Sequence, residues 1–216
     1  MGSSRRSTLD RFQQEILEAF FDREQRFFLT GGAALAGFHL GHRTTRDLDL
    51  FTIDSVLEEG VTALREVAST LGASLESLRT APEFHRFLVT RGSESVVVDL
   101  VLERAPQLAG KLRFGKISVD PPEEILANKL CTLLSRAELR DLVDVRALEQ
   151  AGYPVEDSLE PASRKDGGLT AGQLAWVLSE ITIGEDAKPP GVTARELQEY
   201  LGDLVLRLTR LAFPSE

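Results

Sequence analysis

Two aspartates separated by one leucine are the first feature of this sequence that indicates chemistry. Asp47 and Asp49 lie in a stretch from Asp47 to Ile53 that predicts a β-strand. Side chains two positions apart on a strand point to the same face, so the two carboxylates project together. Adjacent carboxylates repel each other unless a cation lies between them. The pair therefore predicts a site for Mg²⁺ or Mn²⁺, with phosphate oxygens of a substrate as further ligands.

A pair of glycines precedes this strand and predicts a place for the phosphates. Residues 26–30 form a short apolar stretch that predicts a strand, Gly31-Gly32 ends it, and residues 33–40 predict a helix. Glycines let the backbone approach a phosphate closely, and the first turn of a helix offers free N–H groups to it. The hydroxyl of Thr30 is placed to add a hydrogen bond. The order of strand, turn, helix and strand indicates a nucleotide site.

A third carboxylate, Asp99, interrupts a run of valines in a predicted strand over residues 95–103. Burial of an unpaired carboxylate is costly. Asp99 therefore either lies at a strand end or pairs with an arginine, or it lies beside Asp47 and Asp49 on a neighbouring strand. We favour the place beside Asp47 and Asp49. There Asp99 completes a two-metal site and takes the proton from an attacking hydroxyl.

A second group of charged residues lies further along the chain, in a helical region. Lys129 follows Ile125 by one helical turn, at the edge of an apolar helix face. It is either a surface lysine whose stem lies along that face or a cation that reaches a triphosphate. Asp141 and Asp144 are three residues apart and share a helix face. They either anchor Lys129 or an arginine, or they are solvated.

The elements that must position these residues divide the chain into two halves. Residues 1–120 predict a mixed α/β core domain with a small mixed sheet, and residues 121–216 predict a helical domain, so the fold class is α+β. In the first half, two further helices are predicted. One covers residues 9–24 with a capping box over 7–10, and the other runs from 54 or 55 to 71. Strands are predicted at 84–91 and 95–103, and residues 111–119 predict a strand or an irregular segment. In the second half, helices are predicted at 122–135, 138–151, 170–182 and 193–212, and residues 154–166 are ambiguous.

Composition limits the classes of function. The chain has 216 residues, a formal net charge of −9 and one cysteine, which excludes an intramolecular disulfide. No segment has the roughly 18–20 consecutive apolar residues that span a bilayer, and the pattern predicts a cytoplasmic protein with no membrane partner. An acidic chain binds nucleic acid only through a local basic patch. The candidates for such a patch, each of which could instead be solvated or paired with carboxylates, are Arg43, Arg46, Arg136 and Arg140.

These motifs resemble a known family. The segments concerned are Thr30-Gly31-Gly32-Ala33-Ala34-Leu35, then His42-Arg43 and Thr45 before Asp47-Leu48-Asp49-Leu50-Phe51, then Lys129-Leu130, and Arg140-Asp141-Leu142 with Asp144. They are similar to the AbiEii/AbiGii toxin nucleotidyltransferases, which include the MenT toxins. The resemblance covers roughly residues 9–150. One departure is Ala33, where the family often has a hydroxyl residue.

The resemblance implies a DNA-polymerase-β-like nucleotidyltransferase core with a helical lobe. It implies that Gly31 and Gly32 cradle phosphate, that Asp47 and Asp49 hold metal, and that Lys129 contacts the phosphates. Either Asp141 or Asp144 would be needed for activity. We include Arg43, Thr45 and Arg46, which adjoin the motif, among the nucleotide-binding residues.

The function expected from motifs and resemblance together is transfer of a nucleotide from a nucleoside triphosphate to an acceptor hydroxyl. The expected acceptor is the tRNA 3′ end, and the expected protein partner is a cognate antitoxin. Two alternatives remain open. One is a nucleotidyltransferase that modifies a small molecule of the aminoglycoside type, and the other is a non-catalytic nucleotide-binding module.

Overall fold

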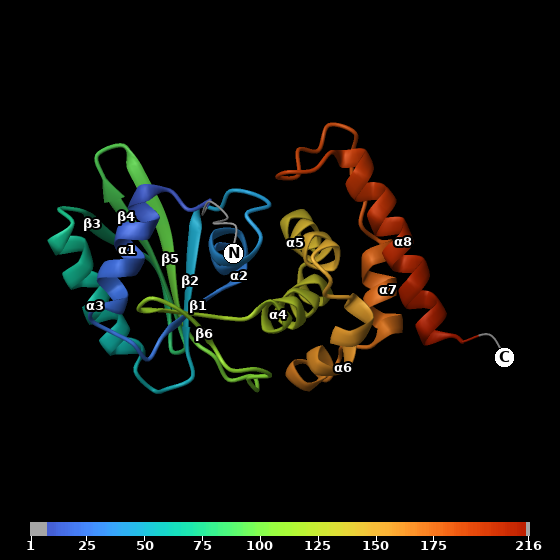
Figure 1. Cartoon of the computed structure of the whole chain (residues 1–216), viewed down its shortest axis with the longest axis horizontal. Helices are drawn as coiled ribbons and strands as arrows, with labels where there is room; N and C mark the ends of the chain where they lie inside the picture. Colours follow the sequence, from blue (N-terminus) through green and yellow to red (C-terminus); the bar gives the residue numbers. More distant parts are fainter. Residues whose placement is uncertain (1–7, 215–216) are drawn as a thin grey trace, which may run out of the picture. The chain divides into compact units, whose positions relative to one another are not determined.

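The computed structural model of the chain describes residues 8–214, which divide into two compact units. Unit 1 comprises residues up to Arg104 together with Ala109–Pro121, and unit 2 comprises Ala105–Leu108 together with the chain from Pro122 onward. Figure 1 shows the strands of unit 1 and the helices of unit 2. Each unit is described by itself.

Unit 1 is built on one seven-stranded sheet with the strand order β3-β4-β5-β2-β1-β7-β6. The strands are β1 (Phe28–Thr30), β2 (Asp47–Thr52), β3 (Ser74–Ala81), β4 (Phe84–Arg91), β5 (Glu94–Leu102), β6 (Leu112–Phe114) and β7 (Ile117–Val119). Strand β2 pairs in parallel with β5 and antiparallel with β1. The predicted small mixed sheet is therefore confirmed.

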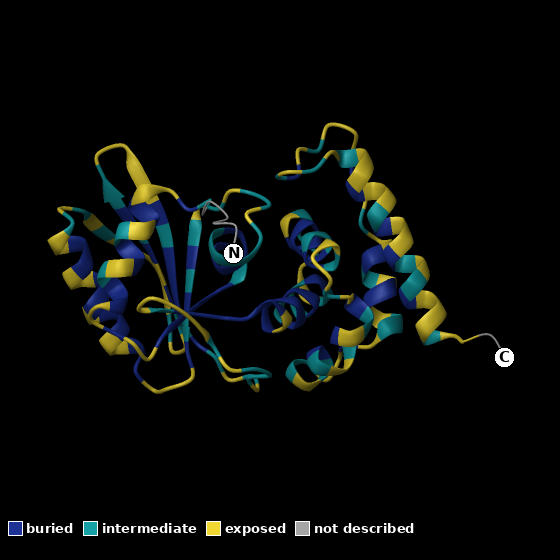
Figure 2. Ribbon diagram, in the orientation of Figure 1, coloured by how far each residue is buried: buried dark blue, intermediate teal, exposed yellow. Residues whose placement is uncertain are grey.

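Two of the helices cover one face of this sheet. Helices α1 (Arg11–Phe21) and α3 (Leu57–Thr70) lie on one side of the strands, and α2 (Gly31–Ala34) lies on the other side, next to β2 (Figure 1). Leu48 and Leu50 are fully buried, as expected for side chains that face α1 and α3. We call the opposite face, which carries Asp47 and Asp49, the open face of the sheet. Figure 2 shows that α1 and α3 carry both buried and exposed residues, as expected for helices with one side against the sheet.

Three local features of unit 1 differ from the sequence-based expectation. The capping box of α1 is formed by Asp10 and Gln13, not by the segment from residue 7, because the Asp10 carboxylate accepts a hydrogen bond from the Gln13 N–H. Residue 7 lies outside the described residues. The helix predicted at 33–40 begins at Gly31 and continues from Leu35 to His39 as a π-helical turn, η1. Strand β3 was not predicted.

Unit 2 consists of helices, as expected for the second half of the chain. They are α4 (Pro122–Ser135), α5 (Leu139–Gln150), α6 (Val155–Lys165), α7 (Ala171–Ser179) and α8 (Ala194–Ala212). Glu124, fully buried, forms an ion pair with Lys165 at 2.5 Å and accepts the Leu108 N–H at 2.7 Å. The hydrogen bond connects residues 105–108 to α4, and the two partners together stabilise the buried carboxylate.

Candidate active site

Strand β2 places Asp47 and Asp49 on the open face. Its residues alternate between half-buried and buried, beginning with Asp47 half-buried. Asp49 lies opposite Thr30 on β1, the residue directly before the glycine pair. The two carboxylates and the start of α2 thus meet at the end of β1, as the spacing of the sequence predicts.

The glycine pair lies against the charged side chains of the site. Gly31 has φ +63°, and a Cβ there would lie 2.3 Å from Oδ2 of Asp49. A Cβ on Gly32 would lie 2.5 Å from a terminal guanidinium nitrogen of Arg43. Side chains at either position would occupy space taken by the carboxylate or by the arginine. Glycine fits at both positions without displacing either side chain, and the backbone of the pair lies directly against Asp49 and Arg43.

Two further predicted binding residues lie beside this backbone. The Thr30 hydroxyl is buried and has no hydrogen-bond partner among the described residues. A buried hydroxyl without a partner costs about 1–3 kcal/mol, so a ligand oxygen at this point would stabilise it. The Thr45 carbonyl accepts a hydrogen bond from the buried Gln13 amide at 3.1 Å, which ties the Arg43–Arg46 loop to α1. Arg46 is exposed on that loop.

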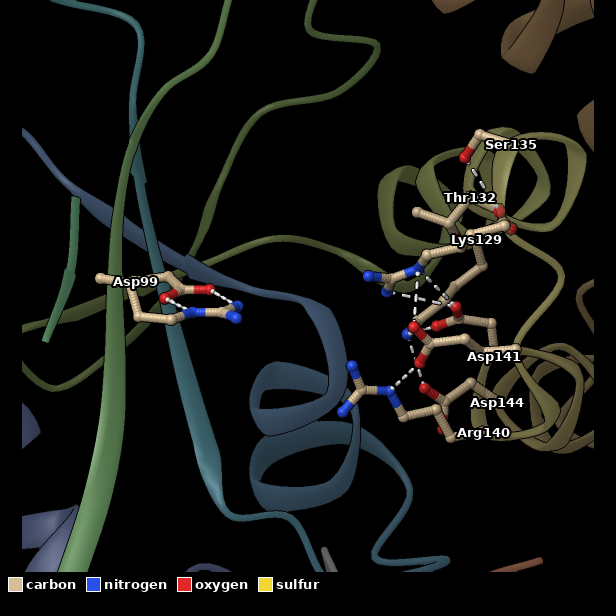
Figure 3. A network of polar contacts seen from close by, with 10 residues as sticks. Asp99, Lys129, Thr132, Ser135, Arg140, Asp141 and Asp144 are labelled. Atoms are coloured by element: carbon tan, nitrogen blue, oxygen red, sulfur yellow. Dashed lines mark hydrogen bonds and ion pairs between the residues drawn. The ribbon is translucent and has the colours of Figure 1, made fainter. Parts of the chain in front are cut away.

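Asp99 lies on β5 directly beside Asp49, because the two residues are register partners in the parallel β2–β5 pair. Its side chain is buried, and Nε and Nη2 of Arg86 donate to its two oxygens at 2.8 and 2.6 Å. Figure 3 shows the Asp99 carboxylate facing this guanidinium. Both readings of Asp99 thus hold in part, since it pairs with an arginine and also lies next to the β2 carboxylates.

Arg86 was not predicted as a site residue. It lies on β4 opposite Asp99. Hydrogen bonds to Asp99, together with the negative charges of Asp99, Asp47 and Asp49, raise the pKa of Arg86 above its ordinary value. A guanidinium therefore lies in the field of the whole acidic strip, the name we use for Asp47, Asp49 and Asp99. The signal in the sequence was an arginine near the start of a predicted strand that is only partly apolar.

The second predicted group is brought together inside unit 2. Nζ of Lys129 on α4 lies 2.6 Å from Oδ1 of Asp141 and 2.8 Å from Oδ2 of Asp144, both on α5 (Figure 3). The lysine side chain is 9% exposed and both aspartates are fully buried. The expectation that these aspartates anchor Lys129 is confirmed. The alternative that Lys129 is a surface lysine is wrong, because α5 packs against α4 and its two buried aspartates hold the ammonium group.

The charges of this cluster are closely balanced. Arg136 adds a second cation, with Nη2 at 3.2 Å from Oδ2 of Asp141. Burial lowers the pKa of Lys129, but attraction to Asp144 and Asp141 outweighs this and holds the pKa above its ordinary value. Lys129 is therefore a permanent cation at neutral pH. Arg140, the other predicted basic residue, is exposed and pairs with Glu138 at 2.7 Å.

Comparison with known families decides the class of the protein. The model of the family described as nucleotidyl transferase AbiEii toxin, type IV toxin–antitoxin system, matches residues 15–203. The chain belongs to this family. It is therefore a nucleotidyltransferase of a toxin family, and a toxin of such a system implies an antitoxin partner. The predicted resemblance is confirmed, and the match extends well past the 9–150 region that carries the motifs.

Solved structures similar to this AbiEii-family chain share its fold. JHP933 from Helicobacter pylori matches with a TM-score of 0.56 and 16% identity, over 94% of this chain and 92% of its own. A putative nucleotidyltransferase from H. pylori matches with a TM-score of 0.55 and 17% identity, over 93% and 95%. MenT4, a nucleotidyltransferase toxin from Mycobacterium tuberculosis H37Rv, matches with a TM-score of 0.57 and 17% identity, over 92% and 82%. No curated protein matches.

Nucleotidyltransferases generally use divalent ions, which need oxygen ligands from the AbiEii-family chain. Among the described residues, no group of three or more His, Cys, Asp and Glu side chains is placed to hold a metal ion. Mg²⁺ commonly binds through only one or two carboxylates plus substrate phosphates, and Asp47 and Asp49 fit that pattern. The role of Asp99 as a further ligand stays a prediction, since its oxygens accept from Arg86.

Within residues 8–214, no helix has both the length and the apolar character needed to cross a bilayer.

Proposed function

We propose that this chain transfers a nucleotide from a nucleoside triphosphate to the 3′-terminal hydroxyl of a tRNA, with Mg²⁺ or Mn²⁺ bound by Asp47 and Asp49. The observation that carries the proposal is the meeting of three features at one point of the sheet. These are the paired carboxylates of β2, the glycine backbone at the end of β1, and the guanidinium of Arg43. Together they offer oxygen ligands for a cation and a close approach for phosphate.

Each residue of unit 1 has a defined part in this proposal. The backbone at Gly31 and Gly32 and the side chain of Arg43 would bind the triphosphate. Asp47 and Asp49 would hold the divalent ion, whose charge neutralises the phosphate oxygens during transfer. The Thr30 hydroxyl would donate to a phosphate oxygen. Arg43 would bind with two parallel N–H groups, a geometry that suits phosphate.

Asp99 would orient the acceptor hydroxyl. Arg86 occupies one lone pair on each of its oxygens, and a carboxylate has further lone pairs free to accept a hydrogen bond. The acceptor oxygen would attack the α-phosphorus, so a new phosphorus–oxygen bond forms as the bond to the bridging oxygen breaks. Pyrophosphate leaves, and Asp99 receives the proton of the hydroxyl.

For unit 2 we propose that the Lys129–Asp141–Asp144 cluster is required for activity, as the resemblance implies. Lys129 is already held by two carboxylates. A phosphate contact by Lys129 would therefore need one of its remaining N–H donors, and Asp141 and Asp144 would fix the direction of that donor.

The proposal is tested by an acceptor screen with purified protein. Each α-labelled nucleoside triphosphate is incubated with tRNA, other RNA, protein or an aminoglycoside, with Mg²⁺, Mn²⁺ or EDTA. The expected result is label on the tRNA 3′ end that needs a divalent ion. This label should be lost in Asp47→Asn, whose half-buried side chain can be changed with the fold intact by circular dichroism. Nucleotide binding without transfer under any metal would instead support a non-catalytic module.

A further inference from the structure

The open face of the sheet carries a second feature beyond the acidic strip. On β4, Phe84 and Arg86 are two residues apart and point to this face, because Arg86 reaches Asp99. On the neighbouring strand β3, Arg79 is the register partner of Arg86. The guanidinium carbons of Arg79 and Arg86 lie 5.7 and 5.6 Å from the centre of the Phe84 ring. We call these three residues the arginine–phenylalanine patch.

The two arginines of the patch differ in what they are free to bind. Arg86 is committed to Asp99 by two hydrogen bonds. Arg79 is exposed and has no ion pair with any other residue of the described range 8–214. Within that range, the Arg79 guanidinium makes a cation–π contact with the Phe84 ring. Arg79 is therefore the cation of the patch that is available to an incoming anion, and Phe84 is half-buried with part of its surface accessible.

The order of the strands places this patch on the acceptor side of the reaction. The glycine pair follows β1, on one side of β2, whereas β5, β4 and β3 lie in sequence on its other side. Phosphoryl transfer proceeds with the attacking and leaving oxygens roughly in line. If the triphosphate lies at the glycines, its leaving group points toward the β1 side. The attacking hydroxyl must then arrive from the side of β5, where Asp99 and the patch lie.

The chemistry of the patch selects among acceptors. An accessible aromatic ring next to guanidinium groups suits a nucleobase, which stacks on the ring, and a phosphate, which pairs with the arginine. A polycationic aminoglycoside has no aromatic base to stack on Phe84, and it would be repelled by Arg79, whose charge no carboxylate of the described residues neutralises. Resting on the proposed function, we infer that Arg79 and Phe84 form the acceptor subsite and bind the last nucleotides of a single-stranded nucleic acid 3′ end, while Arg86 positions Asp99.

Binding is measured first, so that the result does not depend on activity. Fluorescence anisotropy of a short single-stranded RNA labelled at its 5′ end gives the dissociation constant for the full chain. Base stacking predicts that Phe84→Leu weakens binding by about 5- to 100-fold and that Phe84→Trp preserves it. Arg79→Glu should weaken binding. It should also reduce the slope of the logarithm of the affinity against the logarithm of the salt concentration by about 1, the value for one lost phosphate contact. Arg113→Glu, an exposed arginine on β6 at the other end of the sheet, is the matched control and should have little effect.

Turnover is measured second. In the transfer reaction, Phe84→Leu and Arg79→Glu should raise the KM for the RNA acceptor and leave the KM for the triphosphate near that of the wild type. Unchanged RNA binding in both variants, or efficient transfer by the wild type to an aminoglycoside and not to RNA, would overturn the inference. If RNA binding falls in the variants but the wild type transfers no nucleotide, the subsite stands and the proposed reaction fails.

Discussion

At the scale of single residues, the two glycines of the site lie so close to charged side chains that adding one methyl group at either position tests the site. Gly31 combines a left-handed backbone with a carboxylate oxygen 2.3 Å from where its Cβ would lie. Gly32 has no positive φ, and only the flexible end of Arg43 occupies the space beside it. The two glycines are therefore unequal, although the sequence presents them as a pair.

We predict that Gly31→Ala impairs catalysis more than Gly32→Ala. Alanine at Gly31 costs about 1–2 kcal/mol in backbone strain and displaces Asp49, so kcat should fall on the order of 10²-fold. Alanine at Gly32 moves only the tip of Arg43 and should mainly raise the KM for the triphosphate. Steady-state kinetics and thermal melts of both variants check this. Equal kcat values in Gly31→Ala and the wild type would show that Asp49 is not held at this backbone for catalysis.

The sequence predicted some site residues and missed others for a physical reason. Asp47 and Asp49 were predictable, because alternation along one strand fixes their common direction. Asp99 was predictable only as one of two alternatives, since its neighbours depend on strand order. Arg86 could not be predicted, because its partner lies on the adjacent strand and no local pattern records the pairing. The burial of Lys129 likewise depends on how α5 packs against α4.

At the scale of elements, the sequence predicted the strands and helices with regular apolar patterns. Strand β4 and helix α4 have the predicted bounds, and the ends of β2, β5 and α8 agree to within one residue. Strand β3 was missed because it is an edge strand whose residues are mostly exposed, so it lacks the alternation that marks a half-buried strand. Its Leu75 and Leu78 have a helical spacing instead. Only pairing with β4 defines it.

Helix α6 was ambiguous in the sequence, and the reason is Pro161 in its interior. A proline there removes one backbone N–H and normally ends or bends a helix. Val155, Ser158 and Ala162 are nevertheless buried at helical spacing, and their packing stabilises the helix. Tertiary contacts therefore outweigh the local preference. The same neighbourhood contains the ion pairs that join α5, α6 and α8.

Glu149 is the centre of those contacts and predicts a pH dependence. Burial raises its pKa, but hydrogen bonds from Arg207, Tyr200 and the Val155 N–H outweigh burial and hold the pKa below its ordinary value. A lowered folded-state pKa means that the stabilisation is present above the unfolded pKa, about 4.3, and is lost as pH falls through the folded pKa. We predict that Glu149→Gln destabilises the protein at pH 7 by about 2–3 kcal/mol.

Denaturant unfolding at several pH values checks this prediction. The difference between the wild type and Glu149→Gln should be constant near neutral pH and shrink as pH falls below about 4. Glu160→Gln is the control, since Glu160 forms an exposed ion pair with Arg164, and its effect should stay within about 0.5 kcal/mol. A difference that grows toward acid pH would contradict the account of Glu149.

At the scale of the whole molecule, the negative net charge of the chain is opposed to binding of nucleic acid, the proposed acceptor, and local arginines are needed to offset it. The chain has a formal net charge of −9, so nucleic acid is not attracted to it as a whole. Arg43 at the glycines and Arg79 on the open face provide positive charge where phosphates are expected. Membership in the AbiEii family fixes the reaction class. That the residues of unit 1 named above perform the reaction is our proposal.

The measurement that tests the central claim most directly is nucleotide incorporation by Asp49→Asn. This change keeps the size of the side chain and removes the charge that would hold a divalent ion. Asp54→Asn, an exposed aspartate two residues past the end of β2, is the matched control. We predict that Asp49→Asn, with an unchanged circular dichroism spectrum, transfers label to RNA more slowly by about 10²-fold or more, and that Asp54→Asn matches the wild type. A folded Asp49→Asn protein that incorporates nucleotide at the wild-type rate would contradict the account.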